Sequence, residues 1–462
     1  MAKVLISIPY ARCLKTFLDT PIYRELRARH SVTIVSYLAD CPGFAESYGG
    51  PAVGFQPGAM IHGRLRRAAY ALFESHRVMG FLFRWRKRHT WLPWHALLNT
   101  SGNVRRRRPW VRAALWLISV IGDRVRMDEV LKSLLGGWIF QDKEVDHLFR
   151  TESPDVLVCT SHGSEQEAIL CHLARKYGVA TILAPNTLDA FLFHGFLAHR
   201  YDRICAAGPK DRWLLEHLHG YPPDRIVDLG VISNRYYSSL ASEERDGGLR
   251  QRLRIGSDAR ILYYLSVAKA YYTDLLPALD HLLDAIKNGR LADTVIVIRA
   301  APGDDVDVLR RRYGEDPRMR IQIAGPKSVG MVDCPDFTKD VDAEHVEFVE
   351  TLRDSAVVVM SATTSAFLHA ATFGIPTIAN VAELSAYPTW SVSPRRNVAW
   401  DGMGMFAMGL PVARTLDQLV DKVAERFADP NKDEAVWERI LEQWDYQNER
   451  YVDDFLDVVA RS

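Results

Sequence analysis

Apolar residues recur along the chain in short runs that alternate with longer amphipathic stretches. Near the start, residues 4–8 and 31–36 are apolar runs of strand length, and a helical stretch between them begins at Thr20 and Pro21. Thr is a favoured N-cap residue, and Pro fits the first position of a helix. A strand, a helix and a strand in this order predict a βαβ unit, in which the two strands are parallel.

The same alternation returns after residue 150 and continues almost to the end of the chain. Further strands are predicted at residues 155–160, 179–183, 201–206, 225–230, 261–265, 294–298, 319–323, 356–360 and 376–379. Helices are predicted at residues 164–177, 210–218, 275–287, 344–353, 365–373, 416–428 and 434–459. We therefore expect an α/β protein with two Rossmann-like, doubly wound domains that face a cleft, where ligands bind at the carboxyl ends of the strands.

A polar stretch at residues 236–258 separates the two alternating regions and is predicted to be a linker. The expected domains are then residues 1–235 and 259–430, followed by a C-terminal helix at 431–462. A chain of 462 residues has room for two or three domains. Within the first domain the alternation stops at residues 64–148, which we interpret as a helical insertion.

The insertion begins with a basic, tryptophan-rich window. Residues 64–126 hold fifteen Lys and Arg, among them Arg105 to Arg108, and only two acids, so their net charge is +13 in a chain of +1. They also hold five of the eleven tryptophans. This composition suits an interfacial helix on an anionic membrane. The alternatives are an insertion with solvated arginines and a nucleic-acid surface. We expect the membrane as a partner, and no nucleic acid.

The sequence also bears on the compartment. The first apolar run is too short for the core of a signal peptide, and no window approaches the roughly 18 apolar residues of a spanning helix. The six cysteines are scattered, without a CxxC pair, which indicates reduced thiols. We expect a cytoplasmic protein, peripherally associated with the inner face of the membrane.

Residues 361–376 carry the most informative chemistry. Ser361, Thr363, Thr364 and Ser365 lie between an apolar run and a helical stretch. A helix N-terminus offers free backbone N–H groups and the positive end of a dipole, so hydroxyls there cap the helix or bind phosphate. Capping needs one such residue. The presence of four hydroxyl residues therefore favours diphosphate binding over capping alone.

With the Gly374-Ile375-Pro376 sequence that closes it, this segment resembles the donor-site motif of GT-B glycosyltransferases, above all bacterial enzymes that build surface polysaccharides of the capsule and lipopolysaccharide type. The family has a ribose-binding Glu where this chain has His369. The sequence from Arg299 to Pro302 is similar to the family's Arg-x-His-Pro motif, with Ala301 in place of the His. Residues 179–230 resemble the end of its N-terminal domain.

The resemblance implies transfer of a sugar from a nucleotide-sugar donor to a membrane-proximal saccharide or lipid-linked acceptor. The candidate donor-binding residues are Lys269, Arg299, Thr363, Thr364, Ser365 and His369. Cations are needed where charge develops on the leaving diphosphate, and Arg suits bidentate phosphate contact. Enzymes of this fold do not generally need a bound metal, so we expect neither a metal nor a cofactor beyond the substrate.

An inverting enzyme needs a general base in the first domain to activate the acceptor hydroxyl. The candidates are Asp19, His162, Asp189 and His194. His162 directly follows a predicted strand and precedes Gly163, which places it at the edge of the expected cleft. A retaining enzyme would need no such base, and the sequence leaves both outcomes open.

Other functions are compatible with the same fold. A nucleotide-sugar 2-epimerase and a CDP-polyol phosphotransferase are the enzymatic alternatives, and a non-catalytic membrane-bound scaffold is a third. An epimerase acts on a soluble substrate and gives no reason for the basic, tryptophan-rich window.

Overall fold

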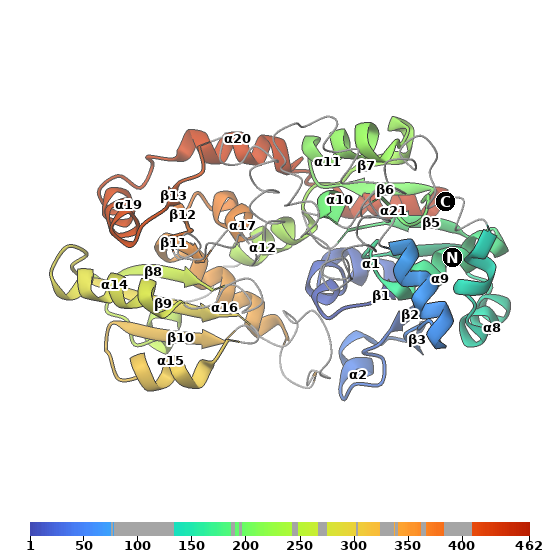
Figure 1. Ribbon diagram of the computed structural model, residues 1–462, viewed down its shortest axis with the longest axis horizontal. Helices are drawn as coiled ribbons and strands as arrows, with labels where there is room; N and C mark the ends of the chain where they lie inside the picture. Colours follow the sequence, from blue (N-terminus) through green and yellow to red (C-terminus); the bar gives the residue numbers. More distant parts are fainter. Residues whose placement is uncertain are drawn as a thin grey trace, which may run out of the picture. The chain divides into compact units, whose positions relative to one another are not determined.

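The computed structural model describes residues 1–74, 77, 134–185, 190–193, 196–242, 248–266, 275–301, 304–323, 337, 341–361, 366–382 and 409–462. The chain divides into two units (Figure 1). Unit 1 consists of residues 1–233, 330–339 and 444–462, and unit 2 of residues 234–329 and 340–443. The last nineteen residues therefore belong with the N-terminal part of the chain.

Unit 1 is built on a seven-stranded parallel sheet with the order β3-β2-β1-β4-β5-β6-β7. The strands are β1 (Lys3–Ile8), β2 (Ser31–Ser36), β3 (Val53–Pro57), β4 (Val156–Cys159), β5 (Ala180–Leu183), β6 (Arg203–Ala206) and β7 (Ile226–Asp228). In register, Val4 of β1 pairs with Val32 on one side and with Val156 on the other. The order of the strands reverses between β1 and β4, and this reversal is the topological switch point of a doubly wound sheet.

The helices of unit 1 begin and end at residues with local signals. They are η1 (Leu14–Leu18), α1 (Pro21–Arg29), α2 (Phe44–Tyr48), α8 (Lys143–Glu152), α9 (Glu165–Tyr177), α10 (Ala190–Phe193), α11 (Pro209–Leu214), η2 (Leu215–His219), η3 (Pro223–Arg225) and α21 (Tyr451–Arg461). The side chain of Ser164 caps α9 by accepting from the backbone N–H of Glu167 at 3.1 Å. Gly178 ends the same helix with a φ of 69°, in the left-handed region that favours glycine.

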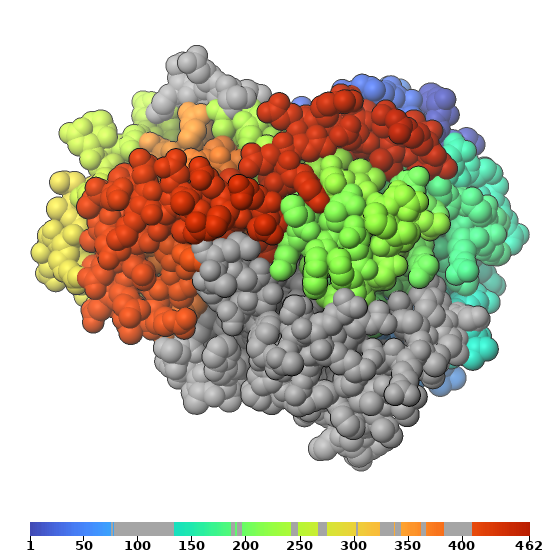
Figure 2. All heavy atoms as spheres, turned by 90° about the horizontal axis from the view of Figure 1, so that it is seen from above, coloured from blue at the N-terminus to red at the C-terminus, as the bar shows by residue number. Residues whose placement is uncertain are grey.

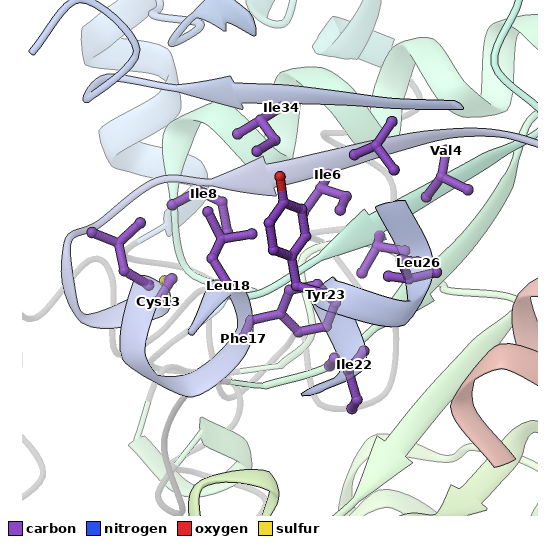
Figure 3. Close-up of a cluster of buried hydrophobic side chains, with 14 of the residues drawn as sticks. Val4, Ile6, Ile8, Cys13, Phe17, Leu18, Ile22, Tyr23, Leu26 and Ile34 are labelled. Atoms are coloured by element: carbon purple, nitrogen blue, oxygen red, sulfur yellow. The ribbon is translucent and has the colours of Figure 1, made fainter. Parts of the chain in front are cut away.

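The core of unit 1 lies between β1 and the helices that follow it in sequence. Val4, Ile6 and Ile8 of β1 point toward side chains of η1 and α1 (Figure 3). Phe17 of η1 contacts Phe455 of α21 edge to face, with ring centroids 5.6 Å apart. The C-terminal helix therefore helps to cover the N-terminal sheet.

Unit 2 is built on a six-stranded parallel sheet with the order β10-β9-β8-β11-β12-β13. The strands are β8 (Arg260–Leu265), β9 (Thr294–Ala300), β10 (Met319–Ile323), β11 (Ser355–Ser361), β12 (Thr377–Asn380) and β13 (Val412–Ala413). The order of the strands reverses between β8 and β11. Both units thus have the doubly wound parallel sheet that the sequence predicts.

The helices of unit 2 include two that lie within or across the expected linker. They are α12 (Ile232–Ser242), α13 (Gly248–Arg252), α14 (Leu276–Lys287), α15 (Val306–Tyr313), α16 (Val341–Arg353), α17 (Ala366–Thr372), α19 (Leu416–Ala428) and α20 (Glu434–Trp444). The stretch at 236–258 therefore contains most of α12 and all of α13. The predicted helix at 416–428 is confirmed, with Thr415 as its N-cap.

The predicted single helix at 434–459 is wrong, because the chain breaks between α20 and α21. Asp445 accepts hydrogen bonds from the backbone N–H of Val231 at 3.0 Å and of Gln447 at 3.1 Å. The backbone at Trp444 also passes so close to Gly208 that a Cβ at Gly208 would lie 2.4 Å from a backbone carbon. These tertiary contacts override the local helical pattern. Figure 2 shows the C-terminal residues, in red, at the molecular surface.

The described cysteines differ in state. Cys13, Cys159, Cys171 and Cys205 are buried thiols that form no disulfide among the described residues, as expected, whereas Cys41 is disulfide-bonded, contrary to the prediction of reduced thiols throughout. Scattered spacing in sequence could not reveal this bond, because the fold decides which cysteines meet. Among the helices of the described ranges, none combines the length and the apolar character needed to cross a membrane.

Candidate functional site

The switch point of unit 1 is held together by hydrogen bonds from the turn after β4. The hydroxyl of Thr160 donates to the carbonyl of Ser7, at the end of β1, at 2.7 Å. Oε1 of Glu167, in the first turn of α9, accepts from the backbone N–H groups of Thr160 and Ser161, both at 2.8 Å. Glu167 therefore fixes the turn that leads from the strand to His162.

Glu167 is itself an unusual group. Burial raises the pKa of its carboxyl well above the ordinary value, and the nearby Cys171 raises it further. Its buried Oε2 has no hydrogen-bond partner in the described part of the chain. The neighbouring Gln166 donates to the hydroxyl of Ser7 and to the carbonyl of Val35, both at 2.9 Å. The switch point of unit 1 thus contains a buried carboxyl that releases its proton less readily than an exposed one, because its pKa is raised by burial.

His162 lies at this switch point, directly after β4 and its turn. Its side chain is buried, and its ring stacks on Phe191 at 6.1 Å with an interplanar angle of 9°. Nε2 contacts the carbonyl oxygen of Ala190. Because a carbonyl can only accept, Nε2 carries the proton, and in the neutral ring the basic lone pair is on Nδ1. His162 is therefore in a tautomer that can take up a proton at Nδ1.

Of the other predicted bases, the described residues include Asp19 alone. Asp19 accepts a hydrogen bond from the hydroxyl of Tyr48 at 2.8 Å, in the packing of η1 against α2. The structure thus gives Asp19 a structural contact. Asp189 and His194 lie outside the described residues.

Tyr10 and Arg12, which follow β1, are absent from the sequence-based candidates. Burial raises the pKa of Tyr10 to about 12, against the lowering effect of Arg12 and with a further rise from Glu167. The Arg12 guanidinium lies 4.8 Å from the ring centroid of Tyr10, and its buried Nε has no partner in the described ranges. Their place directly after the first strand was the available signal, because the carboxyl ends of parallel strands meet at one edge.

The switch point of unit 2 carries a second polar network. The hydroxyl of Ser361, at the end of β11, donates to the hydroxyl oxygen of Tyr264 in β8 at 2.8 Å. Beside it, the backbone N–H of Ala301 donates to the hydroxyl of Ser266 at 2.6 Å and to a carboxylate oxygen of Asp304 at 2.8 Å. The carboxyl ends of β8, β9 and β11 are thus lined with hydrogen-bonding groups.

Arg299, near the end of β9, supplies a positive charge at the carboxyl edge of the sheet in unit 2. It forms an ion pair with Glu344 of α16 at 2.7 Å, and its guanidinium lies 4.9 Å from the ring centroid of Phe348. Burial disfavours the charged guanidinium, but Tyr263 and Glu344 raise its pKa above the ordinary value. The buried Nη1 of Arg299 has no partner in the described residues. The side chain is therefore a cation that can donate one further hydrogen bond.

His369 lies on α17, within a cluster of aromatic side chains. Its Nδ1 donates to the side-chain carbonyl oxygen of Asn234 in α12, and its ring contacts Tyr237 at 4.8 Å and Phe348 at 6.0 Å. Phe348 joins this cluster to Arg299. Sequence reasoning missed Asn234, Tyr237 and Glu344, because none of them follows a strand.

The remaining donor candidates are not placed. Lys269, Thr363, Thr364 and Ser365 lie outside the described residues, and Thr363 to Ser365 connect β11 to α17 in sequence. Across the described ranges, no group of three or more His, Cys, Asp and Glu side chains is arranged to hold a metal ion.

Comparison with known proteins gives likeness in structure alone. No family model matches the sequence, and no curated protein matches it. A Listeria monocytogenes protein, provisionally described as a UDP-N-acetylglucosamine 2-epimerase, is similar with a TM-score of 0.56 at 10% identity, over 99% of this chain and 96% of that one. The UDP-GlcNAc 2-epimerase of Methanocaldococcus jannaschii is similar with a TM-score of 0.53 at 11% identity, over 100% of both chains. The UDP-GlcNAc 2-epimerase of Neisseria meningitidis, bound to UDP-GlcNAc, is similar with a TM-score of 0.51 at 9% identity, over 100% of both chains.

These likenesses span the whole chain and agree with the strand orders of the two sheets. At such low identity they establish the fold and leave the reaction open. The chain therefore has the GT-B fold, with two Rossmann-like domains.

Proposed function

We propose that this protein is a glycosyltransferase, which moves a sugar from a nucleotide-sugar donor to a saccharide or lipid-linked acceptor. The observation that carries the proposal is Arg299, a largely buried cation near the carboxyl end of β9, whose buried Nη1 has no hydrogen-bond partner in the described residues. Preorganised donors aimed at a leaving diphosphate stabilise the charge that develops there. The hydroxyl residues that follow β11 in sequence, Thr363, Thr364 and Ser365, would supply further donors.

The nature of the donor is supported by a structural neighbour. The Neisseria meningitidis 2-epimerase is a complex with UDP-GlcNAc. We extend this to the present chain as a proposal: the ligand of unit 2 is a nucleoside diphosphate sugar, bound by Arg299, Lys269, Thr363, Thr364, Ser365 and His369. We expect binding without a metal ion, so that EDTA leaves the affinity for the nucleotide unchanged.

On the acceptor side, His162 is the proposed general base of an inverting reaction. Its Nδ1 would accept the proton of the acceptor hydroxyl as the new glycosidic bond forms and the nucleoside diphosphate leaves. Glu167 acts on His162 through the backbone turn of Thr160 and Ser161, and is therefore a positioning residue.

The acceptor is proposed to be membrane-proximal. The support is the sequence of residues 64–126, with its net charge of +13 and five tryptophans, in a chain that is otherwise acidic. Such a segment is attracted to the anionic cytoplasmic leaflet. We accordingly propose a role in cell-surface glycan synthesis at the inner face of a bacterial membrane.

A nucleotide-sugar 2-epimerase is the second candidate, because three proteins similar over nearly the whole chain are described as such enzymes. The two functions differ in whether the sugar leaves the nucleotide. An epimerase converts the nucleotide-sugar to its 2-epimer in the absence of an acceptor, whereas a transferase releases the nucleotide and forms a new glycoside.

The test has two stages. Thermal-shift measurements with UDP, GDP, CMP, CDP and dTDP identify the nucleotide, because a ligand that binds only the folded state raises the melting temperature. The corresponding sugar nucleotide is then incubated with membrane lipid extract or without it, and NMR follows the anomeric protons. Lipid-dependent loss of donor supports the transferase. An acceptor-independent 2-epimer would establish the epimerase, and no shift with any nucleotide would contradict both.

A further inference from the structure

Large apolar side chains are exposed at few positions of the described residues, and most of these lie on two short helical segments. Five of the eight come from residues 64–74 and 134–139. They are Leu65, Leu72, Leu134, Leu135 and Trp138, and we call this set the leucine-tryptophan face. Leu65 is 76% exposed and Leu134 is 75% exposed, so both side chains stand almost fully in solvent.

The two segments pack together through other side chains. The Arg66 guanidinium donates to the carbonyl of Ile139 from Nε at 3.2 Å and from Nη2 at 2.9 Å. Phe73 and Phe140 are buried and meet edge to face at 5.9 Å. The segments therefore already have an apolar interface with each other, and the exposed leucines are additional to it.

The exposed positions follow helical periodicity. Leu65, Ala68 and Leu72 have the i, i+3, i+7 spacing of one helical stripe, and all three are exposed. Leu134 and Trp138, at i and i+4, lie likewise on one side of their segment. An amphipathic helix normally buries such a stripe. Clustered apolar exposure on a single unit marks an interaction surface.

The charges beside this stripe indicate what covers it. Arg64 and Arg67 are exposed next to Leu65, and the chain between the two segments is rich in Lys, Arg and Trp. A partner must therefore offer apolar material and negative charge together. We infer that the leucine-tryptophan face inserts into the headgroup and acyl boundary of an anionic phospholipid bilayer, with Arg64 and Arg67 at the headgroups.

This inference adds an apolar contribution to the electrostatic attraction between the protein and an anionic membrane. Only the purpose of membrane binding, access to a membrane-proximal acceptor, rests on the proposed function. Charge attraction alone is screened by salt, whereas insertion of leucine and tryptophan is not. Binding to anionic vesicles should consequently fall with salt to a residual level that depends on the leucines. Figure 2 shows the teal residues that begin near 134 at the molecular surface.

The experiment is sedimentation of the full chain with vesicles of phosphatidylglycerol and phosphatidylcholine, or of phosphatidylcholine alone, at low and high salt. The test variant is the double substitution Leu65→Ser and Leu134→Ser. The matched control is Ile323→Ser, which removes an apolar side chain of 46% exposure from β10 in unit 2. We expect the test variant to bind anionic vesicles about tenfold more weakly at high salt, and the control to bind like the wild type.

Three results would overturn the inference. In the first, the wild-type protein stays in the supernatant with anionic vesicles at low salt. In the second, the test variant binds vesicles as well as the wild type does at high salt. In the third, light scattering shows that the wild type dimerises through this face while the variant stays monomeric. Melting temperatures confirm that the variants fold. Nucleotide titration of the same proteins keeps the two proposals apart, because donor binding and vesicle binding can fail independently.

Discussion

The two sheets have the same order around the switch point, but their carboxyl edges carry opposite chemistry. In unit 1 the edge of β1 and β4 is formed by hydroxyls, a histidine and the buried Glu167, whose pKa is raised. In unit 2 the edge of β8, β9 and β11 holds the largely buried cation Arg299, paired with Glu344. The first edge suits the uptake of a proton from a hydroxyl, and the second suits an anion.

The comparison shows how one backbone scaffold takes on two roles. The strand order brings the first residues after neighbouring strands to the same edge in both units. What differs is the side chain that reaches this edge from a helix. Glu167, from α9, receives backbone N–H groups, whereas Glu344, from α16, receives a guanidinium. The predictions below test this division of roles, from the largest expected effect to the smallest.

Removal of the cation from unit 2 should have the largest effect. Arg299→Met removes the ion pair between Arg299 and Glu344, whose side chains are only 12% and 20% exposed, and this costs about 3–5 kcal/mol of unfolding free energy. Urea denaturation measures the loss. The control is Arg461→Met, which removes an exposed i,i+4 pair with Asp457 and should change stability by less than about 0.5 kcal/mol. Equal effects in the two variants would show that Arg299 is not a buried, structurally coupled charge.

Removal of the proposed base from unit 1 should affect turnover and leave donor binding intact. We expect His162→Ala, or Asp189→Asn, to lower kcat by roughly 10² or more if the enzyme inverts. The control is His217→Ala, because His217 is exposed and stacks on Trp213. If both site variants keep normal turnover, the base lies elsewhere or the enzyme retains configuration, and NMR of the product anomer separates these two cases.

The hydroxyl segment of unit 2 should contribute to donor affinity. Ser365→Ala or Thr364→Val removes one hydrogen bond to a charged group, worth about 1.5–3 kcal/mol of binding. Calorimetric titration with the nucleotide measures it. Thr415→Ala is the control, because Thr415 only caps α19 and its loss should lower stability without changing affinity. If both site variants bind the nucleotide with unchanged affinity, the hydroxyl residues only cap the helix and do not bind the donor.

The raised pKa of Glu167 in unit 1 should appear in the pH dependence of stability. Burial raises the folded pKa of Glu167 above its unfolded value of about 4.3, so the folded state holds a proton that the unfolded state has released. This contribution is present at pH below 4 and is lost as the pH rises, by at most about 1.4 kcal/mol per pH unit. Glu167→Gln should therefore lose less stability than the wild type between pH 5 and 7 in urea denaturation. Identical losses would mean that Glu167 is ionised in the fold.

Local signals in the sequence were sufficient for most elements. The alternation of strands and helices predicted both parallel sheets, and Ser164 and Gly178 marked the ends of α9 correctly. The helix predicted at 434–459 failed at Asp445, whose partner Val231 is 214 residues away. Periodicity reports the preference of a segment by itself, and it contains no information on contacts of that range.

The candidate site divides in the same way. From local pattern the sequence predicted that His162 and Arg299 follow strands, which is right for His162, whereas Arg299 lies inside β9 as its penultimate residue. It gave no signal for Glu344, which is 45 residues from Arg299, or for the Ser7 carbonyl, which is 153 residues from Thr160. Such partners are chosen by strand order and helix packing.

The sequence by itself therefore determined the class of fold, the residues that follow each strand and the concentration of positive charge at residues 64–126. The tertiary structure alone decided the environment and partners of the residues at the strand ends: a raised pKa at Glu167, a proton on Nε2 of His162 and an ion pair at Arg299. The physical reason is that a pKa and a hydrogen bond depend on burial and on neighbours brought from distant parts of the chain, which only the packed fold supplies.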